Sequence, residues 1–183
     1  MVDEAVRLIQ AEGIAALTLR EVGSRLGVSR SALYRHFADK DALVAAVALE
    51  GFRMLRAALR EAWRTAAPGP RRLDGMGTAY VRFAVEHPSH YRVMFGADLA
   101  AMSETVAASD ESVDAFQALV DGIVAQQCDG HLRPDEPKQL ALYIWAVVHG
   151  VAMLALDGRL PPDVDVAALS GLANERLHTG IAR

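Results

Sequence analysis

Helical periodicity runs through almost the whole chain of 183 residues, and it limits the possible folds more than any other feature. Apolar residues recur every three or four positions, and the alternation typical of strands is almost absent. Glycine and proline clusters such as Pro68-Gly69-Pro70 interrupt the pattern. The intervals predict about nine helices, near residues 2–12, 18–26, 29–37, 39–65, 71–86, 89–95, 110–128, 136–157 and 165–179. We therefore expect an all-α protein.

Two short helices joined by a tight turn are predicted within residues 18–40. The Thr18 hydroxyl can accept a hydrogen bond from the amide of Glu21, and the Glu21 carboxylate can reach back to the amide of Thr18, forming a capping box. The stretch from Leu26 to Ser29 has the length and the glycine of a helix-turn-helix turn. Gly23 leaves little bulk where the second helix must pack closely. The segment is predicted to be a helix-turn-helix.

The outward face of the second of these helices suits a DNA major groove. Leu33 and Phe37 mark its inward direction, and each residue turns the helix by about 100°. The side chains that then lie outward, or can swing outward, are those of Arg30, Ser31, Ala32, Tyr34 and Arg35. This set is small, hydrogen-bonding and cationic, and arginine can donate two hydrogen bonds to guanine.

The charge of the chain is unevenly distributed. The net charge is −4, but residues 1–64 carry +2 and residues 65–183 carry −6. An acidic body with a locally basic end is expected of a protein that docks that end on DNA. Thr18 and Lys40 lie at predicted helix N-termini, where amide groups attract phosphate, and Tyr34 and His36 can also donate to phosphate.

The order and spacing of these residues resemble the signature of the tetracycline-repressor (TetR) family. The similar runs are Thr18 to Val22, Leu26 to Phe37 and Asp39 to Leu43, within about residues 3–47. The stretch Leu142 to Gly150, with Tyr91 to Gly96 before it, is similar to a subfamily whose regulatory domain carries a Trp-His-Gly motif. The resemblance implies a three-helix DNA-binding domain over residues 1–47 and a helical ligand-sensing and dimerisation domain over residues 48–183.

The resemblance also implies a cytoplasmic homodimer, usually a repressor, that a small molecule releases from a palindromic operator. The family's DNA-contacting positions fall on Thr18, Arg30, Ser31, Ala32, Tyr34, His36 and Lys40. Family members usually have several residues, often basic, before the first helix, whereas the first helix is predicted here from about Val2.

Aromatic and flexible apolar residues are candidates for contacting a small apolar or amphipathic effector. They are Tyr80, Phe83, Tyr91, Met94, Phe95, Met102, Phe116, Trp145 and His149. Trp145 and His149 lie four residues apart and therefore share a helix face. His149 can provide a polar contact for a ligand, but the sequence favours a hydrogen-bonded core histidine, and most of the other candidates are expected to fill the core.

The last two helices are the expected dimer surface. The helix near 136–157 is apolar nearly all round, which one neighbouring helix cannot satisfy. The final helix offers the apolar side chains of Val166, Leu169, Ala173 and Leu177. Two copies related by a twofold axis would bury both stripes. The charge-free run Leu140 to Leu156 is shorter than the roughly 20 residues that span a bilayer, so we expect a buried helix and no membrane partner.

Catalytic and metal chemistry are not indicated. His87 and His90 are separated by Pro88, and no further histidine or cysteine nearby completes a metal site. The lone Cys128 is expected to be inert rather than a redox sensor, because no basic residue lies immediately beside it in the sequence. No set of nucleophile, base and orienting residue appears, so neither an enzyme nor a cofactor is expected. Two alternatives remain open: a helical ligand carrier or enzyme with a vestigial helix-turn-helix, and a transcriptional activator of the same fold.

Overall fold

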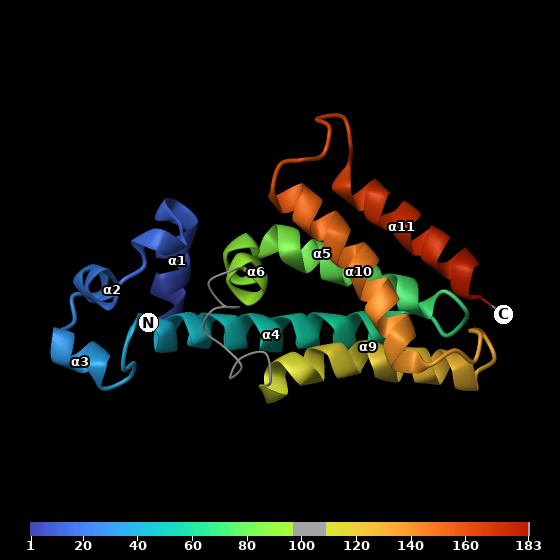
Figure 1. The fold of residues 1–183 in the computed structure, drawn as a ribbon, viewed down its shortest axis with the longest axis horizontal. Coiled ribbons are helices and arrows are strands. Elements are labelled where there is room, and N and C mark those ends of the chain that lie inside the picture. Colours follow the sequence, from blue (N-terminus) through green and yellow to red (C-terminus); the bar gives the residue numbers. More distant parts are fainter. Residues whose placement is uncertain (97–108, 183) are drawn as a thin grey trace. The chain divides into compact units, whose positions relative to one another are not determined.

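The computed structural model describes residues 1–96 and 109–182, apart from the side chain of Arg30. Within these residues the regular structure is helical, so the predicted all-α class is confirmed (Figure 1). The helices are α1 (Val2–Glu12), α2 (Leu19–Leu26), α3 (Arg30–Tyr34), α4 (Lys40–Thr65), α5 (Arg72–Glu86), α6 (Pro88–Phe95), α9 (Asp110–Cys128), α10 (Pro137–Leu156) and α11 (Val166–Ile181), with a 3-10 turn at Ile14–Ala16.

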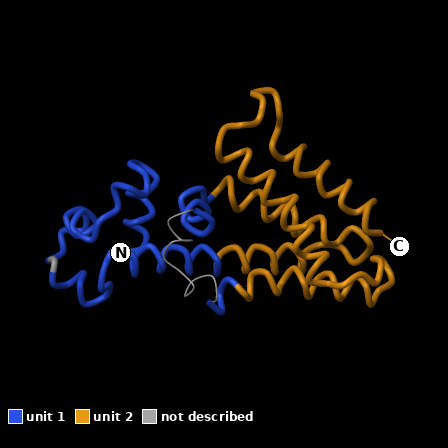
Figure 2. Tube along the Cα trace, viewed as in Figure 1, with its two compact units in different colours: residues 1–53, 87–112 blue, residues 54–86, 113–183 orange. Residues whose placement is uncertain are grey.

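The chain divides into two compact units (Figure 2). Unit one comprises Met1–Arg53 and His87–Ser112, and unit two comprises Met54–Glu86 and Val113–Arg183. Unit one extends beyond the predicted segment 1–47, because α6 packs against α1 and against the first part of α4. At Gly51 of α4 the Met94 side chain of α6 comes so close that a Cβ atom would overlap it.

Unit one is built around the inward faces of its helices. Leu8 of α1, Leu17 after the 3-10 turn, Val22 of α2 and Leu43 of α4 are completely buried. Because these residues recur at helical spacing, burying them determines which side of each helix remains exposed. The opposite faces of these helices are left to solvent.

Unit two is held together by α5, which packs against both α10 and α11. The buried Asn174 of α11 donates from Nδ2 to the Asp74 carbonyl oxygen (3.1 Å) and to Thr78 Oγ1 (3.0 Å). Gly77 lies directly under this amide, where a Cβ atom would overlap Asn174 Oδ1. The polar contact and the glycine together set how closely α5 and α11 approach.

The helix α10 is buried only in part. It is long and apolar enough to cross a membrane, and an 18-residue stretch of it has a mean hydropathy of 1.8. Only 33% of that stretch is buried. Its inner stripe includes Leu140, Ile144 and Val148. The opposite side exposes Leu142 (51%), Tyr143 (54%) and Leu154 (43%). The expected buried helix is therefore found for one face only, since no described neighbour covers the other.

Candidate nucleic-acid interface and effector site

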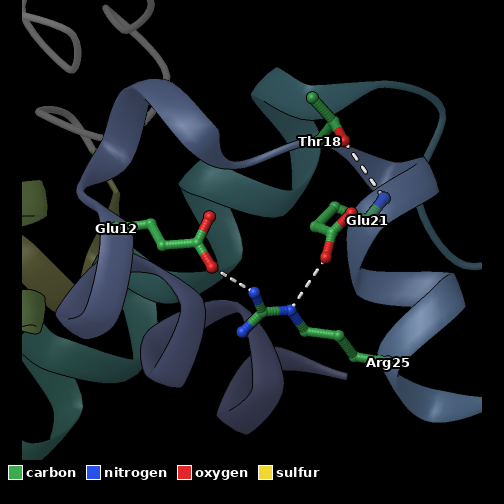
Figure 3. Close-up of polar contacts among 4 residues, drawn as sticks. All are labelled: Glu12, Thr18, Glu21 and Arg25. Atoms are coloured by element: carbon green, nitrogen blue, oxygen red, sulfur yellow. Dashed lines mark hydrogen bonds and ion pairs between the residues drawn. The ribbon is translucent and has the colours of Figure 1, made fainter.

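The first helix of the helix-turn-helix is α2. Of the two hydrogen bonds predicted for the capping box at its start, one is formed. Thr18 Oγ1 accepts a hydrogen bond from the Glu21 amide at 3.1 Å (Figure 3). The reciprocal bond of a capping box is not formed between these two described residues. The Glu21 carboxylate instead accepts from Arg25 Nε at 3.0 Å.

Arg25 is the centre of a small ion-pair network in unit one (Figure 3). Its guanidinium donates both to Glu21 of α2 and to Glu12 of α1. Hydrogen bonds to Glu21 first, and then to Glu12, raise the pKa of the Arg25 guanidinium. Arg25 therefore links α1 to α2, and its charge is already compensated within the protein.

The turn between α2 and α3 has the predicted chemistry. Gly27 adopts φ 65° and ψ 25°, the left-handed conformation that glycine favours at a helix end. Ser29 Oγ accepts from the Ala32 amide at 3.3 Å and caps α3. A Cβ atom on Gly23 would overlap Leu33 Cδ1, which confirms that α3 packs closely at this glycine.

The outward face of α3 is placed as the helical spacing predicts. Leu33 is 1% exposed, whereas Tyr34 is 46% exposed, and Ser31 and Arg35 are also exposed. Ala32 is half-buried, and α3 ends at Tyr34 rather than near Phe37, with the His36 amide bonded to the Leu33 carbonyl oxygen. The face therefore presents short polar and cationic groups to solvent.

The predicted phosphate-contacting residues belong to the same unit but differ in their surroundings. Thr18 and His36 are exposed. Lys40 is half-buried, and its ammonium donates to the Ile14 carbonyl oxygen at 3.3 Å. An ammonium has three donors, so this bond orients Lys40 without using all of its capacity.

Arg20 was not among the predicted contact residues, yet it is the exposed cation of α2 with no ion pair to any residue that the structure describes. At about 100° per residue, Arg20 lies on the side of α2 near Gly23, the residue that packs against α3. Arg25 lies on the other side of α2, next to α1. This angular relation was available in the sequence, but the ion pairs that separate the two arginines were not.

The effector candidates fall into separate clusters. In unit one, Tyr91 and Met94 are buried, and the Phe95 ring contacts those of Tyr91 (centroids 4.8 Å apart) and Phe52 (5.7 Å). The candidates in unit two are Tyr80, Phe83, Phe116, Trp145 and His149. Met102 lies outside the described residues.

Three of the unit-two candidates form a hydrogen-bonded cluster. Trp145 Nε1 donates to the Tyr80 hydroxyl oxygen at 2.9 Å, and this hydroxyl lies 3.0 Å from His149 Nδ1. Tyr80 is only 5% exposed, whereas Trp145 and His149 are half-buried. Burial lowers the pKa of the His149 imidazole. The Phe116 ring lies edge-on to Trp145, with centroids 6.2 Å apart.

In unit one, His87 and His90 form a ring contact with each other. The rings of His87 and His90 lie 6.1 Å apart, and His90 Nε2 is 3.5 Å from Glu50 Oε2. Among the residues that the structure describes, no three His, Cys, Asp or Glu side chains are grouped so that they could hold a metal ion. Cys128 is an exposed free thiol.

Comparison with known proteins identifies both parts of the chain. Residues 1–47 match the family model "Bacterial regulatory proteins, tetR family", and residues 73–174 match "Tetracyclin repressor-like, C-terminal domain". A curated relative, the HTH-type transcriptional activator FasR of Mycolicibacterium smegmatis, is 28% identical over 85% of this chain and 70% of its own length.

Solved structures agree. A Rhodococcus protein of unknown function is 29% identical with a TM-score of 0.89, covering 100% of this chain and 93% of its own. A tetR-family regulatory protein from Rhodococcus is 25% identical with a TM-score of 0.72, covering 97% of this chain and 93% of its own. The chain therefore belongs to the TetR family and is a DNA-binding transcriptional regulator.

Proposed function

We propose that this protein is a cytoplasmic homodimeric repressor that binds a palindromic operator and is released by a small apolar or amphipathic effector. Residues 1–47 would read DNA, and residues 48–183 would bind the effector and form the dimer. The observation that carries the proposal is the exposed polar and cationic face of α3. Regulation of transcription then requires no catalytic residue, cofactor or metal of the protein's own.

DNA reading is assigned to the outward side chains of α3. Arg30, Ser31 and Arg35 would contact base edges in the major groove, and Ala32 is small enough to let the helix approach. Thr18, Tyr34, His36 and Lys40 would contact phosphates and set the register on the duplex. The Arg25 network supports this arrangement because it holds α2, and thereby the turn before α3, against α1.

Dimerisation is assigned to α10 and α11. On α10 the large apolar side chains of Leu142, Tyr143 and Leu154 are exposed. On α11 the exposed one is Leu172, whereas Leu177 of the predicted stripe is buried and the other three residues of that stripe are half-buried. An uncovered apolar stripe of this kind is typical of a subunit interface. A second copy related by a twofold axis would cover the exposed stripe of α10 together with Leu172, and would space two α3 helices for the two half-sites of a palindrome. A membrane is the weaker partner, because the half-buried Trp145 and His149 of α10 are hydrogen-bonded to the Tyr80 hydroxyl of α5.

A transcriptional activator is the second candidate, because the relative from Mycolicibacterium smegmatis is named as one. The two functions differ in the direction of the response. A reporter gene placed behind an operator selected from random DNA would be silenced by a repressor and switched on by an activator.

Replacing Tyr34 by alanine is expected to weaken operator binding by about tenfold or more. The substitution removes a half-exposed ring and hydroxyl from the proposed DNA face, and a lost contact to a charged group costs about 1.5–3 kcal/mol. Fluorescence anisotropy with a labelled operator measures the change. Tyr34→Phe, which keeps the ring, should show a smaller loss. Undiminished binding by the alanine variant would show that α3 is not the reading helix.

Arg20 and Arg25 provide a matched pair of charge removals on one helix. Arg20→Gln is expected to lower DNA affinity and to reduce the slope of log K against log salt by about 0.9, the contribution of one phosphate contact. Arg25→Gln should leave that slope unchanged, because Glu12 and Glu21 already compensate its charge. Titrations with duplex DNA at several salt concentrations measure both slopes. Equal slopes for the two variants would contradict a phosphate contact by Arg20.

A further inference from the structure

The segment between α9 and α10 holds the C-terminal end of α11. The Arg133 amide donates to the Ile181 carbonyl oxygen at 3.1 Å, and Arg133 Nη2 donates to the Gly180 carbonyl oxygen at 2.6 Å. These carbonyl groups are among the last four of α11, which have no donor within the helix. A cation at a helix C-terminus also compensates the partial negative charge there. The two bonds together form a clamp between Arg133 and α11.

The clamp starts from a firmly held backbone. Leu132, the residue before Arg133, is 1% exposed, and Ile181 is 4% exposed. Gln127 of α9 donates from Nε2 to the carbonyl oxygens of Arg133 and Asp135, both at 2.8 Å. Because buried side chains and α9 hold the segment, the Arg133 side chain reaches α11 from a fixed position.

The clamp closes one end of a helical hairpin. The helices α10 and α11 run in opposite directions and contact each other (Figure 1). At one end of the hairpin, residues 157–165 join the two helices covalently. At the other end, α10 begins at Pro137, four residues after Arg133, so the clamp ties the start of α10 to the end of α11. The clamp therefore limits how far the two helices can move apart.

The side chains assigned to the dimer come from both helices of this hairpin. Leu142 and Tyr143 lie about 7–9 Å along the axis from the start of α10, and Leu172 lies on α11. Their positions relative to one another depend on the angle between the helices. A twofold axis applies any change of this angle to both subunits at once.

We propose that Arg133 is a positioning residue for dimerisation, whose clamp holds α10 and α11 at the angle at which a second copy covers them. This inference rests on the proposed function, which assigns the dimer to these two helices. If the clamp is open part of the time, the apparent affinity between subunits falls with the square of the closed fraction, because both subunits must be closed.

A graded series at Arg133 tests the proposal in the full-length protein. Arg133→Lys keeps a cation that can donate to Gly180, Arg133→Gln keeps a neutral donor, and Arg133→Glu places a carboxylate against carbonyl oxygens. Sedimentation equilibrium measures the dimer dissociation constant. The constant is expected to change least for lysine, to rise about three- to tenfold for glutamine, and to rise about tenfold or more for glutamate. An unchanged constant for Arg133→Glu would overturn the proposal.

Arg159 provides the matched control for the charge. Each arginine faces an aspartate two residues away, with Arg133 Nε 3.6 Å from Asp135 and Arg159 Nε 3.8 Å from Asp157. Among the described residues, no bond joins the Arg159 guanidinium to α11. Arg159→Glu should therefore leave the dissociation constant unchanged. An equal effect of the two glutamate substitutions would contradict the role of the clamp.

Hydrogen exchange separates an open clamp from a damaged fold. In Arg133→Gln, the amide of residue 133 should exchange faster, because its bond to Ile181 opens more often. The amides of Ile144 and Val148, on the buried side of α10, should exchange at the same rate as in the unmodified protein. If they accelerate as much as the amide of residue 133, the substitution acts through unfolding and the assigned role is wrong.

The two levels of the proposal fail differently. If Leu142→Glu leaves the dimer intact, the assignment of the interface to α10 and α11 fails, and with it that part of the proposed function. If Leu142→Glu dissociates the dimer but Arg133→Glu does not weaken it, only the role of Arg133 fails.

Discussion

Leu142→Glu is expected to yield a monomer that binds its operator about 10²- to 10⁴-fold more weakly than the unmodified protein. Leu142 is 51% exposed on the face of α10 assigned to the dimer, and the twofold axis would place two new carboxylates in one apolar interface. Desolvating them without partners opposes association. Operator affinity then falls because a monomer binds one half-site, whereas the dimer binds two at once. Joining two binding sites in one molecule raises affinity by about 10²- to 10⁴-fold.

The matched control for this variant lies on a different helix. Val113 of α9 has nearly the same exposure, 53%, but is outside the proposed interface. Val113→Glu should therefore stay dimeric and keep its operator affinity. Sedimentation equilibrium measures the mass of each variant, and anisotropy titrations measure DNA binding. A dimeric Leu142→Glu protein, or an equal effect of Val113→Glu, would show that another surface forms the dimer.

Gly77→Ala is expected to lower the free energy of unfolding by about 1–5 kcal/mol. The added methyl group must displace the buried Asn174 side chain, since its Cβ would overlap Asn174 Oδ1. Overpacking costs about 1–3 kcal/mol, and losing the bonds to Asp74 and Thr78 costs a further 1–3 kcal/mol. The higher helix propensity of alanine returns about 1 kcal/mol.

Gly75 provides the control on the same helix. A Cβ atom there would lie 3.6 Å from the Ala62 carbonyl oxygen and 3.8 Å from Ala66 Cβ, which are ordinary contact distances. Gly75→Ala should therefore stabilise the protein by about 1 kcal/mol through helix propensity alone. Denaturant unfolding curves for both variants measure the difference. If both substitutions change the free energy of unfolding in the same direction, the close approach of α5 and α11 at Gly77 does not determine stability.

The helix-turn-helix illustrates how far local signals reach. The cap at Thr18, the left-handed Gly27, the cap at Ser29 and the close approach at Gly23 all follow from residues a few positions apart. Their hydrogen bonds and helical spacing depend on neighbouring residues, which the linear order specifies. The same signals place Ser31, Tyr34 and Arg35 outside without any knowledge of distant contacts.

Other features required the folded chain. Arg20 and Arg25 are similar residues on one helix, and only the position of α1 brings Glu12 to Arg25. Tyr80 and His149 are 69 residues apart, so no local pattern predicts their hydrogen bond. Which face of α10 remains uncovered likewise depends on the helices that pack against it. Hydropathy shows that the surface of α10 is apolar. Only the packing shows that the side with Leu142 and Tyr143 is exposed. Helix formation is governed by nearby residues, whereas pairing between helices depends on the shapes and charges of side chains distant in the sequence.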